Sequence, residues 1–225
     1  MPASSAWITT ALQAGPRFLN LLAELKPTFH LPDVTSLDLA FLAKHSVSAL
    51  LWDVDGTLMP YHDRLVSPEL AGALAALRGQ VPQAILSNCG DARLLELAAI
   101  FDDLPVLKTY AVDGRIVMRR LERGRELWKA GGMHVQRPTG IMAAINKPSA
   151  ELVRLVLEEL EVEAERRPLA LMVGDQHLTD VAGANLAGIR SAKVQTIAPR
   201  SFPLPIRCFH LFERSMYRVL HGRPQ

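Results

Sequence analysis

Short apolar runs alternate with segments of helical periodicity along most of this chain, and this alternation limits the folds open to it. The apolar runs have the length of buried strands, and capped or amphipathic helical segments separate them. Strands are predicted at 48–52, 84–86, 106–107, 169–173 and 191–194, and helices at 67–77, 91–101, 149–160 and 181–187. Strands and helices that alternate in this way form a parallel sheet covered on both faces. The predicted fold class is therefore α/β, with a doubly wound parallel sheet.

The length of 225 residues suits one large domain, and 49% hydrophobic residues allow it a large core. We expect a helical N-terminal segment at 1–44, an α/β core at 45–198 and a basic, aromatic C-terminal helix at 199–225. Two cysteines, Cys89 and Cys208, give no disulfide framework and fit a reducing compartment. No secretory leader is recognised, and no apolar run approaches the ~20 residues that span a bilayer. A cytoplasmic protein is expected, with peripheral attachment to the inner face of the membrane as the alternative.

Two carboxylates follow the first apolar run, in Asp53-Val54-Asp55-Gly56-Thr57. Both acids belong to the loop at the carboxyl end of a strand, which is the edge where open α/β sheets bind ligands. Acids this close cannot easily both ionise in a dry pocket without a cation, and Mg²⁺ prefers oxygen ligands. The alternative is a solvated acidic turn, because such turns also occur for structural reasons alone.

Three further polar clusters fall after strands or at helix starts. Ser87 and Asn88 end the second strand and carry groups that can grip phosphate oxygens. Lys147 precedes a proline and a helix, where it is either a surface charge or a counter-charge for a phosphoryl group. Asp175 and Asp180 follow a glycine at the end of a strand, and two acids five residues apart can face one metal ion.

With these four clusters in this order, the chain resembles the haloacid dehalogenase (HAD) superfamily of phosphotransferases over roughly residues 45–195. A closer likeness points to subfamily IIIA phosphatases, which include YqeG-like proteins and phosphatidylglycerophosphate phosphatases. It is carried by Leu25-Lys26-Pro27, by Lys147-Pro148 and by the segment 174–188. The chain departs from that subfamily at Gly56, in the sequence Ser87-Asn88-Cys89 and in its longer spacing between the second and third motifs.

The resemblance implies a mechanism and a set of site residues. Asp53 would be the nucleophile that forms an aspartyl-phosphate, and Asp55 the general acid and base. Mg²⁺ would be held by Asp53, by the backbone carbonyl of Asp55, and by Asp175, with Asp180 acting directly or through water. Ser87, Asn88 and Lys147 would bind the substrate phosphate.

The substrate implied is a phosphorylated one, and phosphatidylglycerophosphate, an anionic lipid, is preferred. The alternatives are a soluble sugar phosphate or nucleotide monophosphate, and a non-catalytic binding or regulatory protein on the same scaffold. No nucleic-acid partner is expected, and the oligomeric state is left open.

Basic residues gather in two places that could face an anionic surface. The segment 105–140 separates the second and third motifs, is too short for a full cap domain, and alternates around Asp113-Gly114 as a β-hairpin does. Its stretch 115–137 holds seven basic and two acidic residues. After Asp180, seven basic residues stand against one acidic residue, Glu213. Apolar residues also mark both ends of the chain, so membrane contact and packing on the core are both open.

Three other polar residues near the motifs are given structural interpretations. His62 and His177 flank the site, but single histidines near loops are more often hydrogen-bonded or solvated than catalytic. Cys89 is expected to be a small buried residue, because Asp53 already supplies the nucleophile.

Overall fold

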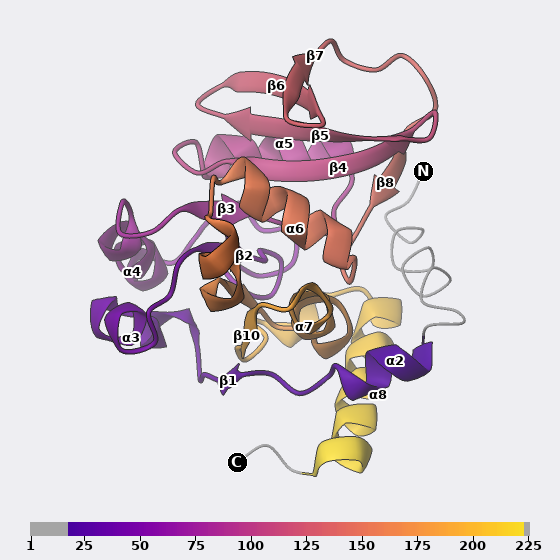
Figure 1. Ribbon diagram of the computed structural model, residues 1–225. Coiled ribbons are helices and arrows are strands. Elements are labelled where there is room, and N and C mark those ends of the chain that lie inside the picture. Colours follow the sequence, from indigo (N-terminus) through magenta and orange to yellow (C-terminus); the bar gives the residue numbers. More distant parts are fainter. Residues whose placement is uncertain (1–17, 223–225) are drawn as a thin grey trace.

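The computed structural model describes residues 18–222, and its centre is one ten-stranded sheet (Figure 1). Its strands lie in the order β1 (Phe29–His30), β10 (Arg190–Lys193), β9 (Leu171–Gly174), β2 (Leu50–Trp52), β3 (Gln83–Ile85), β4 (Val106–Val112), β5 (Arg115–Glu122), β6 (Arg125–Ala130) and β7 (Met133–Val135). A further strand, β8 (Ala143–Ile145), pairs with β4. Every neighbouring pair from β1 to β4 is parallel, and every pair beyond is antiparallel.

The helices are α2 (Phe18–Ala23), α3 (Leu39–Lys44), α4 (Pro68–Leu77), α5 (Asp91–Ile100), α6 (Ala150–Glu159), α7 (Ala182–Ala187) and α8 (Leu204–His221). Shorter turns of helix are η1 (Val34–Ser36), η2 (Ala164–Leu169), η4 (Pro199–Ser201) and the π-helical turn η3 (His177–Val181). Serine side chains cap two of the helices: Ser67 accepts from the backbone N–H of Leu70, and Ser149 accepts from that of Leu152.

Strand β2 shows why the sheet is covered on both faces. Successive side chains of a strand point to opposite faces. Leu50 and Trp52 lie in a buried cluster with residues of α3, α4 and α5, whereas Leu51 lies in a second cluster with residues of α6 and α7. Both faces of β2 are fully buried, which explains its continuous apolar sequence. The doubly wound α/β fold predicted from the sequence is confirmed.

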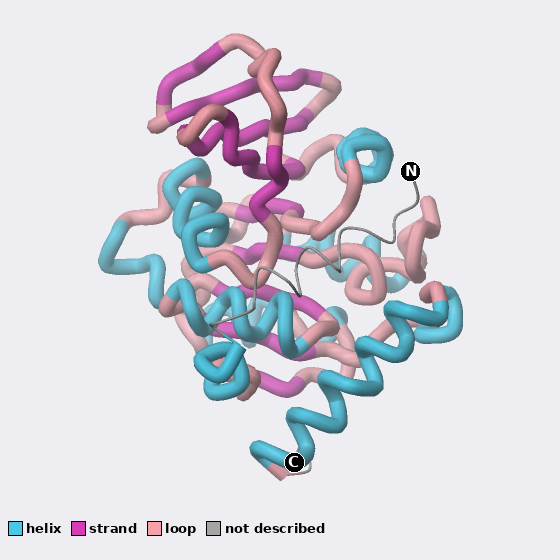
Figure 2. The backbone as a smooth tube through the Cα atoms, turned by 90° about the vertical axis from the view of Figure 1, so that its right-hand side faces the viewer, coloured by secondary structure: helices cyan, strands magenta, loops and turns pink. Residues whose placement is uncertain are grey.

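The segment between the second and third motifs extends the central sheet (Figure 2, top). The hairpin predicted around Asp113-Gly114 is present: β4 and β5 pair in antiparallel register, and both turn residues have positive φ. The third strand, however, runs to Val112 rather than ending at 107, and β6, β7 and β8 were not predicted. The side chains of β6, β7 and β8 are mostly exposed or half-buried, so these strands lack the buried apolar run or regular alternation that predicts a strand.

The carboxyl ends of β2, β3 and β9 meet at one edge, because these strands are parallel neighbours. Asp53 directly follows β2, Ser87 lies two residues beyond β3, and Asp175 directly follows β9. The fold thus brings three segments far apart in the sequence to the same edge of the sheet.

The C-terminal helix α8 packs against α2 (Figure 1). It also packs against η3. Tyr217 is buried with Leu25 and Leu178, and this cluster attaches the helix to the core. Along its length, α8 also exposes large apolar side chains, namely Leu204, Leu211, Phe212, Val219 and Leu220. The N-terminal apolar residues Trp7, Ile8 and Leu12 lie outside the described residues. Between residues 18 and 222, the structure holds no helix that is long and apolar enough to cross a membrane.

Candidate active site

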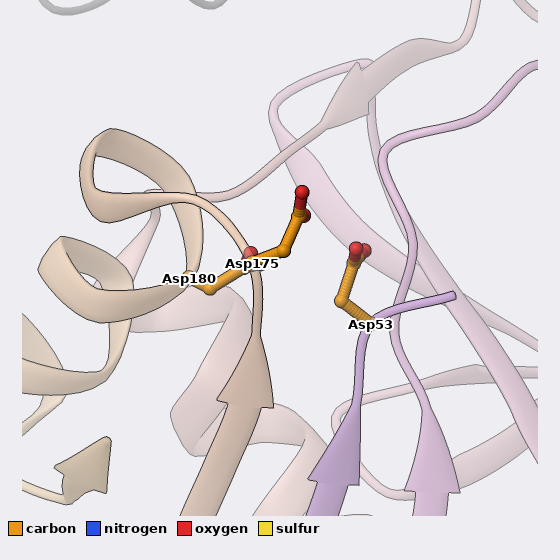
Figure 3. A group of neighbouring side chains, drawn as sticks. All are labelled: Asp53, Asp175 and Asp180. Carbon is orange, nitrogen blue, oxygen red and sulfur yellow. The ribbon is translucent and has the colours of Figure 1, made fainter. Parts of the chain in front are cut away.

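Three buried carboxylates converge at the edge of the sheet. Asp53, Asp175 and Asp180 each place one oxygen within 4.8 Å of the others (Figure 3). Asp53 comes from the loop after β2, Asp175 from the loop after β9, and Asp180 from η3. Asp53 is more than a hundred residues from the other two acids. The parallel pairing of β2 with β9 brings it beside them.

Lys147 connects two of these acids. Its Nζ donates to Asp53 Oδ1 and to Asp180 Oδ1, each at 2.6 Å, and only 2% of its side chain is exposed. Burial alone would lower the pKa of Lys147, but Asp180 and Asp53 outweigh burial and raise it above its ordinary value. The lysine is therefore a fixed positive charge inside the site, rather than the solvated surface charge that the sequence left open.

The site carries more negative charge than Lys147 can balance. Burial raises the pKa of Asp53 to about 7, against the lowering effect of Lys147. Burial, together with Asp53 and Asp180, raises the pKa of Asp175 well above its ordinary value. Both carboxylate oxygens of Asp175 are buried without a hydrogen-bond partner. The carboxylate oxygens of the three acids, two of them without a partner, form a donor set that suits a hard divalent cation such as Mg²⁺, while Lys147 balances part of their charge.

Two glycines allow the acids to approach each other. A Cβ on Gly174 would lie 2.2 Å from the Asp180 side chain, and a Cβ on Gly56 would lie 2.8 Å from Asp175 Oδ2. Gly56 also has a φ of +92°, a conformation that side chains disfavour. A side chain at either position would push a carboxylate out of the cluster.

Ser87 and Asn88 follow β3 at the same edge of the sheet. Ser87 is buried. The Asn88 side chain makes a pair of hydrogen bonds with the backbone of Lys147: Nδ2 donates to the carbonyl at 2.9 Å, and Oδ1 accepts from the N–H at 2.8 Å. Asn88 therefore holds the segment that carries Lys147, and its role in binding a substrate phosphate stays a prediction.

Asp55 lies outside the three-acid cluster, and its carboxylate faces a buried arginine. Arg93 Nη2 donates to Asp55 Oδ1 at 2.7 Å, and the backbone N–H of His62 donates to the same oxygen at 3.1 Å. The motifs gave no indication of Arg93. One sequence signal was present: Arg93 stands four residues before Leu97 on the apolar face of α5, and a charged residue there requires a buried partner.

Two other residues that support the site were also missed. Thr57 donates its hydroxyl to Asp53 Oδ2 at 3.3 Å. Glu213 reaches from α8 into the core, where its carboxylate accepts from the backbone N–H of Leu178 at 3.1 Å. Burial raises the pKa of Glu213 to about 7. Glu213 is the one acidic residue after Asp180. Its isolation in a basic segment was the sequence signal that could have indicated a specific role.

The two histidines near the motifs make contacts within the fold, and burial acts on the thiol of the nearby cysteine. His177 Nδ1 lies 3.0 Å from the carbonyl oxygen of Leu25, and its ring stacks on Tyr217. His62 contributes its backbone N–H to Asp55. Burial raises the pKa of the Cys89 thiol to about 11, which leaves it protonated at neutral pH.

Arginines of the antiparallel extension are paired with acids of the chain. Arg119 has 5% of its side chain exposed and pairs with Glu126, while Arg120 pairs with Glu122 and Glu159. The charges of these two residues are thus balanced in part within the fold, and the expectation that the basic excess of 115–137 faces an anionic partner stays a prediction. The sequence count could not show which charges were already paired.

The fold and the acid cluster define a class: an α/β protein with a carboxylate-rich site at the carboxyl edge of its parallel strands. Comparison with known families gives a narrower assignment. Residues 144–197 match the HAD-hydrolase-like family model, and this span contains Lys147, Asp175 and Asp180. The match supports the HAD superfamily and a hydrolase, while Asp53, Asp55 and Ser87 lie outside it. No curated protein and no solved structure matches the chain.

Proposed function

We propose that this protein is a Mg²⁺-dependent phosphomonoester hydrolase that works through an aspartyl-phosphate on Asp53. One observation carries the proposal: Asp53, at the end of β2, is bridged by Lys147 to Asp180 and lies beside the unpartnered carboxylate of Asp175. A nucleophilic carboxylate, a fixed cation and a cation-binding set of oxygens are the groups that phosphoryl transfer requires.

Asp53 is the proposed nucleophile. Its Oδ1 is held by Lys147 and its Oδ2 by the hydroxyl of Thr57, so the carboxylate has a fixed orientation. Burial favours its protonated form, whereas attack requires the ionised one. When bound by Asp53, Asp175, Asp180 and the backbone carbonyl of Asp55, Mg²⁺ would supply positive charge that favours the ionised acid and the phosphoryl oxygens.

Asp55 is the proposed general acid and base. As Asp53 attacks phosphorus, the bond to the leaving oxygen breaks, and Asp55 gives that oxygen a proton. The resulting carboxylate then takes a proton from the water that attacks the aspartyl-phosphate, which releases phosphate and regenerates Asp53. Ser87 and Lys147 would hold the phosphoryl group throughout.

The preferred substrate is phosphatidylglycerophosphate, which resides in a membrane. The exposed residues of α8 support binding of the protein to such a lipid surface. The helix exposes Leu211 and Val219 alongside the exposed Arg207 and Arg218. Its one acidic residue, Glu213, is buried, so no negative charge of the helix opposes an anionic surface. Peripheral attachment to the inner face of a membrane belongs to this proposal.

A phosphate-release assay with and without Mg²⁺ tests the activity. The substrates would be phosphatidylglycerophosphate in vesicles, p-nitrophenyl phosphate, a sugar phosphate and a nucleoside monophosphate. Asp53→Asn serves as the inactive control. Mg²⁺-dependent release from the lipid in preference to the others is expected. Preference for a soluble phosphate would favour the runner-up activity, and no release from any substrate would favour a binding protein on this scaffold.

Vesicle co-sedimentation tests the lipid surface separately. Wild-type protein should bind anionic vesicles at low salt and lose binding at high salt, because screening weakens the contribution of the arginines. Replacing Leu211 and Val219 together by Gln should abolish binding. Met133→Gln removes a similarly exposed side chain from β7 and serves as the matched control. Equal binding of all three proteins would overturn the assignment of α8 as the lipid-facing element.

A further inference from the structure

Arg93 is a buried arginine beside the proposed acid and base. It is the third residue of α5, and only 3% of its side chain is exposed. Its Nη2 lies 2.7 Å from Asp55 Oδ1, and its Nη1 lies 3.2 Å from Glu96 Oε2. Glu96 is more exposed than Asp55, with 38% against 13% of the side chain accessible. The shorter and less solvated ion pair of Arg93 is therefore the one with Asp55.

The donors around Asp55 distinguish its two carboxylate oxygens. Oδ1 accepts both from Arg93 and from the backbone N–H of His62. Among residues 18–222, the structure gives Oδ2 no such donor. An oxygen that already accepts two N–H groups is a poor place for a proton, so Oδ2 is the oxygen that can carry one.

We propose that Arg93 is a positioning residue that fixes the Asp55 carboxyl group for proton transfer to the leaving oxygen; this proposal rests on the function proposed above. Arg93 touches Asp55 and acts through it. As the bond between phosphorus and the ester oxygen breaks, the ester oxygen takes the bonding electrons and receives the proton from Asp55 Oδ2. The bond from Asp53 to phosphorus forms in the same step.

Two substrates whose leaving groups differ in acidity provide a test that distinguishes a positioning role of Arg93 from a merely structural one. An alkoxide is a poor leaving group and needs its proton, whereas p-nitrophenolate is stable enough to leave without one. A residue that positions the acid therefore matters for alkyl phosphates and much less for p-nitrophenyl phosphate. Damage to the fold or to metal binding would lower the turnover of both substrates.

The experiment compares kcat/KM for an alkyl phosphate and for p-nitrophenyl phosphate, in wild-type protein and in Arg93→Gln. This parameter reports the steps up to the first irreversible one, which includes loss of the leaving group. Arg93→Gln should lower kcat/KM by about 10²-fold for the alkyl phosphate and by less than about tenfold for p-nitrophenyl phosphate. Arg93→Lys retains the charge without the planar fork, and it should show the same selective loss with a native fold.

Two further variants make the result specific. Arg64→Gln is the matched control, because Arg64 also pairs with Glu96, at 3.1 Å, but is 75% exposed; it should retain wild-type kinetics on both substrates. Asp55→Asn should show the same selective loss, and adding Arg93→Gln to it should cost nothing more.

The inference would be overturned if Arg93→Gln and Arg93→Lys each lowered kcat/KM for the alkyl phosphate and for p-nitrophenyl phosphate by the same factor. It would also be overturned if the losses of Asp55→Asn and Arg93→Gln were additive in the double variant. These outcomes differ from failure of the proposed function, in which wild-type protein would release no phosphate and Asp53→Asn would change nothing.

Discussion

Replacing Asp175 by asparagine should stabilise the metal-free protein and remove its response to Mg²⁺. The side chain is buried, neither of its oxygens has a hydrogen-bond partner, and Asp53 and Asp180 are close. Its pKa is raised by burial first and by the two acids next. A carboxyl group whose pKa is higher in the folded chain than in the unfolded chain lowers the stability as pH rises above the unfolded value. At pH 7.5 the metal-free fold therefore bears this cost, and asparagine has the same shape without the charge.

The magnitude follows from the cost of the buried charge and from the sensitivity of Tm. The amide of asparagine also lacks a partner, so the gain is only the part of the burial cost that comes from the charge, on the order of 1–3 kcal/mol, and Tm moves by about 2–4 °C per kcal/mol in a chain of this size. The Tm of Asp175→Asn without metal should thus rise by roughly 2–12 °C. In wild-type protein, Mg²⁺ at a hundred times its Kd should add about 2.7 kcal/mol, or roughly 5–11 °C.

Thermal unfolding of both proteins in chelator and across a Mg²⁺ titration measures these shifts. Asp113→Asn removes an exposed acid at the turn between β4 and β5 and is the control; it should leave the Mg²⁺ response unchanged. A wild-type Tm that ignores Mg²⁺ would refute the reasoning about the acid cluster. So would an Asp175→Asn protein that is less stable in chelator and still gains stability from Mg²⁺.

Three other predictions concern the nucleophile, the glycine beside the acids and a buried histidine. Asp53→Asn should abolish phosphate release while the circular dichroism spectrum stays native; near wild-type turnover would contradict its role. Gly174→Ala should lower Tm and weaken the Mg²⁺ response, because its Cβ would meet Asp180 at 2.2 Å. Gly72→Ala on α4 has open space and should leave that response intact. Similar effects of the two substitutions would count against the close-packing argument. Burial lowers the pKa of His210 to about 4, so this histidine binds a proton more readily in the unfolded chain than in the folded one. The free energy of unfolding should therefore fall, by at most about 3 kcal/mol, as pH drops from 6.5 towards 4. Urea unfolding should show that the free energy of unfolding of His210→Phe falls less steeply across this pH range than that of the wild-type protein. An equal fall would exclude His210 as its cause.

The sequence alone determined the α/β class and the positions of the acidic clusters along it. Those inferences depend on local features: apolar runs of strand length, capped or amphipathic helical segments between them, and polar residues that directly follow strands. Because parallel strands end at a common edge, the sequence also indicated that Asp53 and Asp175 would meet. The structure brings their carboxylates together in the cluster with Asp180.

Only the tertiary structure decided which charges face one another. Lys147 lies between Asp53 and Asp180, Arg93 faces Asp55, and Arg119 is neutralised by Glu126, although nothing in the spacing of these residues specifies a partner. The free energy of a buried charge depends on the groups within a few ångströms, and in this fold those groups come from other strands and helices. The sequence could therefore count the charges of the site, but their pairing follows from the packing of the chain.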